Sequence, residues 1–220
     1  LVGQDGPTHH GVFDIGYLRM VPNFVLMAPK DENELRHMLK TMIDYDRGPI
    51  ALRMPRGRGV GIDLDAELEA LEIGKAEVLR EGKKVVILGY GNCVHPSLAA
   101  AALLEENKIK PTVVNMRFVK PLDTALLDEL MKSEPMVLTV EENARAGGFG
   151  SAVLEYLVDN GYEAKKIRNL GIPDRYLAHA PHADLLAEIG LTPENIAQTV
   201  IEMVTSKRRF LRAAGGGGSS

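Results

Sequence analysis

The strongest constraint on the fold is a repeated alternation of short apolar runs with segments of helical periodicity. Each run is only a few residues long and is bounded by glycine, proline or polar residues, which is typical of a buried strand. Strands separated by helices predict a mainly parallel sheet with helices packed on its faces, so we expect an α/β protein. The runs are NFVLMAP (23–29), PIALRMP (49–55), KKVVILGYG (83–91), PTVVNMRF (111–118) and PMVLTVEEN (135–143).

Capping residues predict where the intervening helices begin. KDENELRHMLKTMIDY (30–45) is amphipathic, and Asp31 with Glu34 at its start predicts a capping box. A helix is also expected in GGFGSAVLEYLVDNG, ended by Gly161, and KKIRNLGIP (165–173) is expected to be a last short strand. Further helix starts are predicted at Asn92, at Asp123, and at Thr192 followed by Pro193.

The length of 220 residues suits one large domain or two small ones. Residues 1–57 read as strand, helix, strand, helix, strand, the end of a parallel α/β domain. Residues 58–72 read as a linker and residues 73–206 as a second α/β domain. Residues 207–220 read as a tail that ends in a flexible Gly/Ser linker. Because the chain lacks an initiator methionine and opens on what reads as the end of a strand, we expect a piece of a longer protein.

Composition argues against several classes of function. The net charge is −4 and the two signs are mixed, whereas nucleic-acid-binding proteins usually carry a basic stripe. The single cysteine, Cys93, excludes an internal disulfide framework and fits the reducing cytoplasm. No apolar run reaches the length that spans a bilayer. We therefore expect a cytoplasmic protein with neither nucleic acid nor membrane as a partner.

The motif DGPTHHG near the start holds the first candidate site residues. Asp5 can accept hydrogen bonds from hydroxyl groups, and His9 or His10 can donate to a developing alkoxide or move a proton near neutral pH. A loop after a parallel strand is where open α/β sheets bind ligands. A plain turn with exposed histidines explains the motif equally well. A zinc site is the weaker alternative, because adjacent histidines lack the spacing of known metal motifs.

The motif RMPRGRG holds Arg53, Arg56 and Arg58 directly after another predicted strand. The planar guanidinium of arginine binds phosphate through two parallel hydrogen bonds. If the two strand ends lie side by side, Arg56 faces the same crevice as His9. A solvated basic start of the linker is the alternative.

Other polar motifs are assigned structural roles. GYGN (89–92) lacks the third glycine of a nucleotide-binding turn, so a tight strand-to-helix turn is favoured. Glu141 and Glu142 could act as a paired acid and base, but the glycines after them favour close packing of a helix on the sheet or on a second subunit. His179 and His182 are expected in a surface loop and cap, and Cys93 in the core.

Three of these motifs together resemble a known family. D-G-x-T-H at Asp5, P-x-D-x-x-E at Pro29 and R-x-P-R-G at Arg53 are similar to the C-terminal portion of the 1-deoxy-D-xylulose-5-phosphate synthases, within the transketolase superfamily. The resemblance runs from about Val2 to Val204. It implies the end of a pyrimidine-binding domain in residues 1–57 and a three-layer transketolase C-terminal domain in residues 73–206.

The resemblance also implies residue roles. Enzymes of this family condense pyruvate with glyceraldehyde 3-phosphate and release carbon dioxide, the first step of the methylerythritol phosphate route to isoprenoids. Asp5 matches the residue that contacts substrate hydroxyls, and His9 matches the histidine over the reacting carbon. Arg56 matches the residue that holds the acceptor phosphate, with Arg53 in support, while His10 has no implied role. Both His9 and Asp5 are thus candidate catalytic and substrate-binding residues.

The implied cofactors are thiamine diphosphate and Mg²⁺ in the complete enzyme. The G-D-G metal motif and the glutamate that activates the aminopyrimidine ring precede this segment in the family. The segment alone is therefore expected to bind neither cofactor and to be inactive. Its expected partners are the N-terminal half of the same enzyme and a second copy in a homodimer.

Three alternatives remain open at this stage. The chain could belong to a transketolase, whose strand-end motif is usually S-R-Q, or to the β subunit of a 2-oxo acid dehydrogenase, which lacks D-G-x-T-H. It could also be an inactive module for dimerisation. Acceptor choice distinguishes the enzymes, and the association state of residues 73–206 alone bears on the third.

Overall fold

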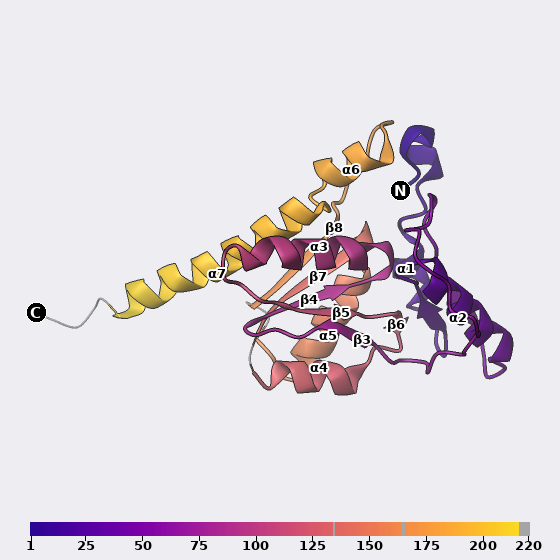
Figure 1. Cartoon of the computed structure of the whole chain (residues 1–220), viewed down its shortest axis with the longest axis horizontal. Coiled ribbons are helices and arrows are strands. Elements are labelled where there is room, and N and C mark those ends of the chain that lie inside the picture. Colours follow the sequence, from indigo (N-terminus) through magenta and orange to yellow (C-terminus); the bar gives the residue numbers. More distant parts are fainter. Residues whose placement is uncertain (134, 164–165, 216–220) are drawn as a thin grey trace, which may run out of the picture.

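The computed structural model describes residues 1–133, 135–163 and 166–215, with side chains to residue 205. It contains two sheets (Figure 1). The larger has the strand order β3-β5-β4-β7-β8, and the smaller has the order β2-β1-β6. The five strands of the larger sheet are β3 (Glu77–Arg80), β4 (Val85–Gly89), β5 (Thr112–Asn115), β7 (Met136–Ala144) and β8 (Ile167–Ile172).

Helices cover both faces of the larger sheet, as the three-layer expectation requires (Figure 1). One face packs on α4 (Thr124–Met131) and α5 (Phe149–Asp159), around Leu127 and Phe149. The other packs on α3 (Val94–Glu105) and α7 (Pro193–Gly215), around Leu104 and Ile196. Strands β4 and β5 of the larger sheet are buried on both faces, which is why they read as continuous apolar runs.

The first part of the chain forms a smaller unit beside this sheet. Its elements are α1 (Asp14–Leu18), β1 (Val25–Met27), α2 (Glu32–Asp44) and β2 (Ile50–Leu52), and β1 and β2 pair in parallel. The third strand of its sheet, β6 (Phe118–Lys120), comes from the second half of the chain and pairs antiparallel with β1. The two units therefore share a sheet.

Several expectations are confirmed at the local level. Asp31 caps α2 by accepting from the Glu34 amide at 2.9 Å, and Asp123 caps α4 by accepting from the Leu126 amide at 3.1 Å. Pro193 is the first residue of α7, and the Thr192 hydroxyl oxygen accepts from the Asn195 amide at 3.4 Å.

Other expectations are wrong. The expected opening strand is a 3-10 turn over Gly3–Asp5, followed by a second over Pro7–His9. Asn92 does not cap α3; it lies in a 3-10 turn over Gly91–Cys93, and its amide is directed to Glu142. The antiparallel edge strand β3 was not predicted, and the single strand expected in 111–118 is two strands, β5 and β6. The expected tail is partly helical, since α7 continues to Gly215, and residues 216–220 lie outside the described residues.

The segment 58–72 contains no helix or strand, yet it is held along one side of α2. The Glu32 carboxylate accepts from the amides of Val60 and Gly61 at 2.8 and 2.5 Å. Farther along, the His37 ring contacts the Asp65 carboxylate at 2.9 Å, and the Leu71 amide donates to the Thr41 hydroxyl at 2.7 Å. Side chains of one helix thus satisfy the backbone of an otherwise irregular segment.

A buried carboxylate joins the two units. Glu34 is 2% exposed and accepts hydrogen bonds from the Lys30 amide at 2.7 Å, from the Asn115 amide side chain at 2.8 Å and from Arg117 Nε at 2.7 Å. Lys30 and Arg117 both reach Glu77 as well, at 3.0 Å. Removing a buried charge from water is costly unless it is paired and hydrogen-bonded, so Glu34 requires the second unit to be docked.

We expect Glu34→Ala to lower the free energy of unfolding by about 2–4 kcal/mol, because Asn115 and the Lys30 amide would lose their acceptor and Arg117 would keep only Glu77 as counter-charge. Urea denaturation measures the change. Glu155→Ala is the control, since Glu155 forms an exposed ion pair with Arg19, and it should cost at most about 1 kcal/mol. Equal losses in the two variants would contradict the assignment of Glu34 as the joining residue.

Candidate functional site

Two successive 3-10 turns shape the loop that carries the first candidate residues. The Gly6 amide donates to the Gly3 carbonyl and the His9 amide to the Gly6 carbonyl, each at 3.1 Å. Gly6 has φ of +73°, and a Cβ on it would lie 2.2 Å from Nε2 of His179. Only glycine fits this position, because the backbone is left-handed and the His179 ring packs directly on it. The turns place Asp5 and His9 in one compact loop.

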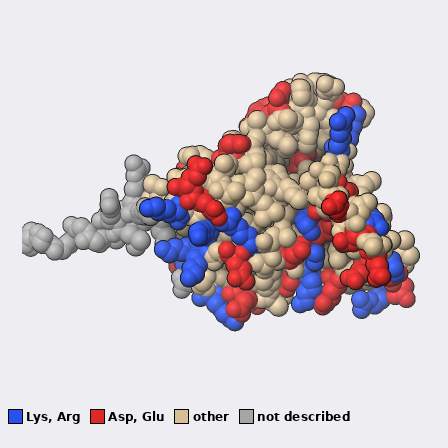
Figure 2. All heavy atoms as spheres, in the orientation of Figure 1, with Lys and Arg blue, Asp and Glu red and all other residues tan. Residues whose placement is uncertain are grey.

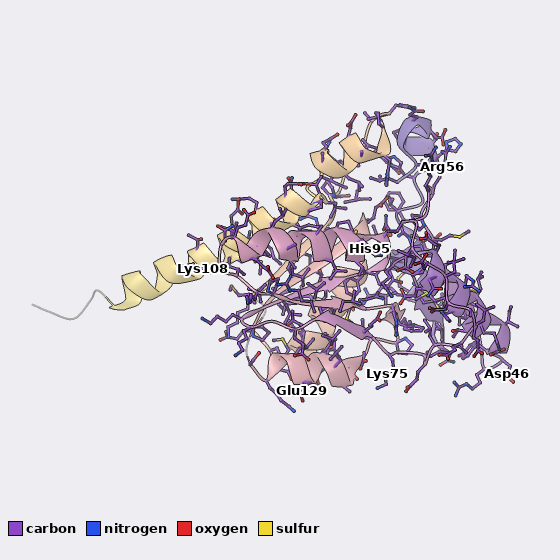
Figure 3. The ribbon with its side chains drawn as sticks, in the orientation of Figure 1. Asp46, Arg56, Lys75, His95, Lys108 and Glu129 are labelled. Carbon is purple, nitrogen blue, oxygen red and sulfur yellow. The ribbon has the colours of Figure 1, made fainter. Side chains whose placement is uncertain are left out.

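Arg56 meets this loop from the segment after β2. Its guanidinium forms an ion pair with Asp5, and its Nη1 atom also donates to the Val2 carbonyl at 3.4 Å. Both side chains are accessible, at 63% for Arg56 and 39% for Asp5. Arg56 lies next to the first turns of the chain at the upper right of Figure 3. Arg56 therefore reaches the DGPTHHG loop at Asp5, although a 3-10 turn over Gly3–Asp5 takes the place of the expected opening strand. That Arg56 faces the same crevice as His9 stays a prediction.

The two histidines of the loop have different surroundings. His9 is exposed, and its Nδ1 atom lies 3.0 Å from the Thr8 hydroxyl. When that hydroxyl donates to Nδ1, the ring proton is on Nε2 and can be donated to a ligand oxygen. His10 is half-buried, and its Nε2 atom is buried without a partner among the described residues. Burial, with the positive charges of the chain's amino group and His179, lowers the pKa of His10.

Arg53 faces inward and supports the loop. Its Nε atom contacts both oxygens of Asp14, at 3.1 and 2.9 Å, and its Nη2 atom donates to the carbonyls of Gly11 at 3.3 Å and Glu142 at 2.7 Å. These contacts tie the end of β2 to the loop and to β7. Asp14, which sequence reasoning missed, is the main partner of Arg53, and the support of Arg56 by Arg53 stays a prediction.

Glu142 on β7 makes contacts that the sequence did not predict. It is 2% exposed, and its Oε1 atom lies 2.6 Å from the Leu1 nitrogen and 2.8 Å from Nε2 of His182. The Asn92 side-chain amide donates to its Oε2 atom. His182 is the first residue of α6 (His182–Glu188) and is 35% exposed, close to the expected place in a surface cap, but its contact with Glu142 was not predicted. No local pattern indicates these contacts, because the partners are far apart in the sequence.

The neighbouring carboxylates Glu141 and Glu142 have opposite pKa shifts. Burial raises the pKa of Glu141 to about 7, although the amides of Gly150 and Phe149 donate to it and act the other way. Burial also acts to raise the pKa of Glu142, but the hydrogen bond from His182 and the positive charge at Leu1 outweigh it and lower that pKa to about 2. Glu141 thus serves the start of α5, and Glu142 serves the loop.

The remaining motifs have the structural roles expected of them. GYGN is a tight turn from β4 into α3, and Gly91 has φ of +60°. The glycine-rich start of α5 allows close packing on the sheet, since a Cβ on Gly150 would lie 2.5 Å from the Thr139 hydroxyl. Cys93 is buried, and burial raises the pKa of its thiol.

The surface charges, the described helices and the possible metal ligands bear on which partners the chain could bind. Basic and acidic side chains are interspersed over the lower half of the face drawn in Figure 2. Within the described ranges, no helix is both long and apolar enough to cross a membrane. Among the same residues, no group of three His, Cys, Asp or Glu side chains could hold a metal ion.

Comparison with known proteins finds two matching family models. The transketolase pyrimidine-binding domain matches residues 1–59, and the transketolase C-terminal domain matches residues 74–196. The chain is 54% identical over 208 residues to 1-deoxy-D-xylulose-5-phosphate synthase of Gloeobacter violaceus, covering 94% of the chain and 32% of that protein. It is 51% identical over 209 residues to the synthase of Geobacillus sp., covering 95% of the chain and 33% of that protein. It therefore spans about a third of the length of these relatives.

Solved structures agree with the fold. A split-gene transketolase, described as an inactive β4 tetramer, superposes with a TM-score of 0.78 at 31% identity, covering 91% of this chain and 64% of the other. A transketolase mutant from Pichia stipitis superposes with a TM-score of 0.69 at 21% identity, covering 94% of this chain and 29% of the other. The second likeness supports the fold alone.

Substitution of the two carboxylates should separate their effects on stability with pH. The Glu142 carboxylate stabilises the fold fully above its ordinary pKa of 4.5, and this stabilisation is lost as the pH falls toward 2. Glu142→Gln should therefore lower the free energy of unfolding by about 3 kcal/mol at pH 7 and by progressively less below pH 4.5.

For Glu141 the sign reverses. Because its pKa is raised to about 7, stability falls as the pH rises from 4.5 to 7, and Glu141→Gln should remove that fall.

Urea denaturation at several pH values between about 2.5 and 8 measures both effects, because this range covers the two shifted pKa values. The unsubstituted chain is measured in a matched series. Parallel stability curves for Glu142→Gln and the unsubstituted chain would contradict the assignment of the depressed pKa to Glu142.

Proposed function

The chain belongs to the transketolase family, and from this premise we propose that it is the C-terminal third of a 1-deoxy-D-xylulose-5-phosphate synthase. The proposed enzyme joins pyruvate to glyceraldehyde 3-phosphate with loss of carbon dioxide. This segment would supply the residues that bind the aldehyde acceptor. The observation that carries the proposal is the meeting of Asp5 and Arg56 at an accessible site, in the loop that also bears His9.

Arg56 is suited to the acceptor phosphate. Both of its contacts within the described residues involve Nη1, so Nη2 and Nε keep a pair of donors available for phosphate oxygens. Asp5, beside it, can accept hydrogen bonds from acceptor hydroxyls. Binding the phosphate far from the reacting carbon would fix the distance and direction of the aldehyde group.

His9 is suited to the aldehyde oxygen. That oxygen gains negative charge as the new carbon–carbon bond forms, and a positioned N–H donor lowers the energy of the charged state. The contact between Thr8 and Nδ1 directs the ring so that Nε2 faces away from Thr8 and is free to donate. In this proposal Arg53 holds the loop in place through Asp14 and does not touch the acceptor.

Thiamine diphosphate, when bound, would supply the carbon nucleophile. The diphosphate is ordinarily held through a divalent cation by oxygen ligands. The described residues offer no cluster of that kind, so the cofactor and Mg²⁺ are assigned to the rest of the enzyme and no step is derived through them. A second copy of the enzyme, in a cytoplasmic homodimer, belongs to the same proposal.

A transketolase split between two genes is the second candidate, because the split-gene transketolase chain is itself 31% identical and superposes over most of this chain. The two candidates differ in the donor substrate, since a transketolase takes a ketose where the synthase takes pyruvate. The 2-oxo acid dehydrogenase β subunit and a pure dimerisation module have no observation that favours them.

A chimera tests the proposed function directly. In it, this chain replaces the matching third of the Gloeobacter violaceus enzyme, to which it is 54% identical. We expect the chimera, with thiamine diphosphate and Mg²⁺, to form 1-deoxy-D-xylulose 5-phosphate from pyruvate and glyceraldehyde 3-phosphate, and the chain alone to form none. A folded chimera that turns over only a ketose donor would favour the transketolase candidate.

Arg56→Ala in the chimera should lower kcat/KM for glyceraldehyde 3-phosphate by roughly 10- to 100-fold, the range expected for loss of a charged hydrogen bond. With glyceraldehyde, which lacks the phosphate, steady-state kinetics should give nearly the same kcat/KM for Arg56→Ala as for the unsubstituted chimera. Arg58→Ala is the matched control and should behave like the unsubstituted chimera. An equal loss with both acceptors would contradict phosphate binding by Arg56.

A further inference from the structure

We infer that Glu142 and His182 are positioning residues that hold the Asp5–His9 loop in its working conformation. Both residues lie in the second unit of the chain, whereas the loop lies at the start of the first unit. The inference rests on the proposed function for its link to catalysis. Its structural part concerns only this chain and is tested separately.

Glu142 is the centre of the arrangement. Its carboxylate contacts His182 at the start of α6 and accepts from Asn92 in the turn after β4, and the amino group of this 220-residue chain, at Leu1, lies 2.6 Å from it. The Glu142 backbone carbonyl accepts from Arg53, which also donates to the Gly11 carbonyl in the loop. Leu1 is itself buried, at 6% exposed, so the start of the loop is held by packing as well. Because Glu142 is on β7, the centre of these contacts is fixed by a strand buried over almost its whole length.

The segment before α6 forms the surface on which the loop rests. A Cβ on Gly3 would lie 3.1 Å from the His182 amide nitrogen, and a Cβ on Gly6 would meet the His179 ring. Both glycines have positive φ, and they flank Gln4 and Asp5. The backbone on each side of Asp5 is therefore in contact with residues 179–182.

These contacts position the loop without touching the acceptor. Asp5 faces Arg56, and His9 is exposed, whereas Glu142 is buried. A small shift of the loop would move Asp5 and His9 relative to Arg56, and a misplacement of about 1 Å can lower a rate by roughly 100-fold.

The structural part is tested by hydrogen–deuterium exchange of the 220-residue chain. Glu142→Gln should raise exchange in a peptide covering residues 3–10 by about tenfold or more and leave β4 unchanged. Glu141→Gln is the matched control: it removes a buried carboxylate one residue away and should raise exchange at Phe149 and Gly150 instead. Unchanged exchange in residues 3–10, or an equal rise throughout both units, would overturn the inference.

The link to catalysis is tested in the chimera with two variants of His182. His182→Leu removes the donor to Glu142 and should lower kcat/KM for glyceraldehyde 3-phosphate about tenfold, with the KM for pyruvate unchanged. His182→Gln keeps a nitrogen donor at a similar reach and should restore most of that loss. Loss of exchange protection without any change in these constants would confine the role to structure, and an inactive unsubstituted chimera would count against the proposed function only.

Discussion

The structure depends on the burial of Glu34 between two units. A carboxylate removed from water is tolerated only when donors surround it. Among the described residues, the donors to the Glu34 side chain are Lys30 in the first unit and Asn115 and Arg117 in the second. The pairing of β6 with β1 acts at the same junction. The first unit contributes only two strands, β1 and β2, to its sheet, and a two-stranded sheet is marginally stable by itself. The third strand and the donors to Glu34 from Asn115 and Arg117 come from the second unit.

Glu142 is the counterpart of Glu34 in the opposite direction. Glu34 belongs to the first unit and takes donors from the second, whereas Glu142 belongs to the second and its backbone carbonyl accepts from Arg53 in the first. The two residues thus constrain the first unit at two separate places. In the inference above, the second of these places holds the loop that carries Asp5, which is itself 39% exposed.

Sequence reasoning succeeded where structure depends on neighbours along the chain. The caps at Asp31 and Asp123 and the apolar runs of β4 and β7 are local signals, and the structure confirms them. It failed where pairing crosses the chain. β6 follows β5 after only two residues but joins the other sheet, and no local pattern records that change. The same holds for Glu142, whose partners at Leu1 and His182 are set by tertiary structure.

Under the proposed function, the pairing of Asp5 with Arg56 suits a site that binds and releases a phosphate. An exposed ion pair contributes at most about 1 kcal/mol, so it orients the guanidinium without competing strongly with a dianionic ligand. A buried pair of the kind made by Glu34 would resist any exchange of partner. The strongly held carboxylate Glu34 joins the two units. The pair at the loop is weak and accessible, and both contacts of Arg56 within the described residues involve Nη1, which leaves the donors on Nη2 and Nε for a ligand.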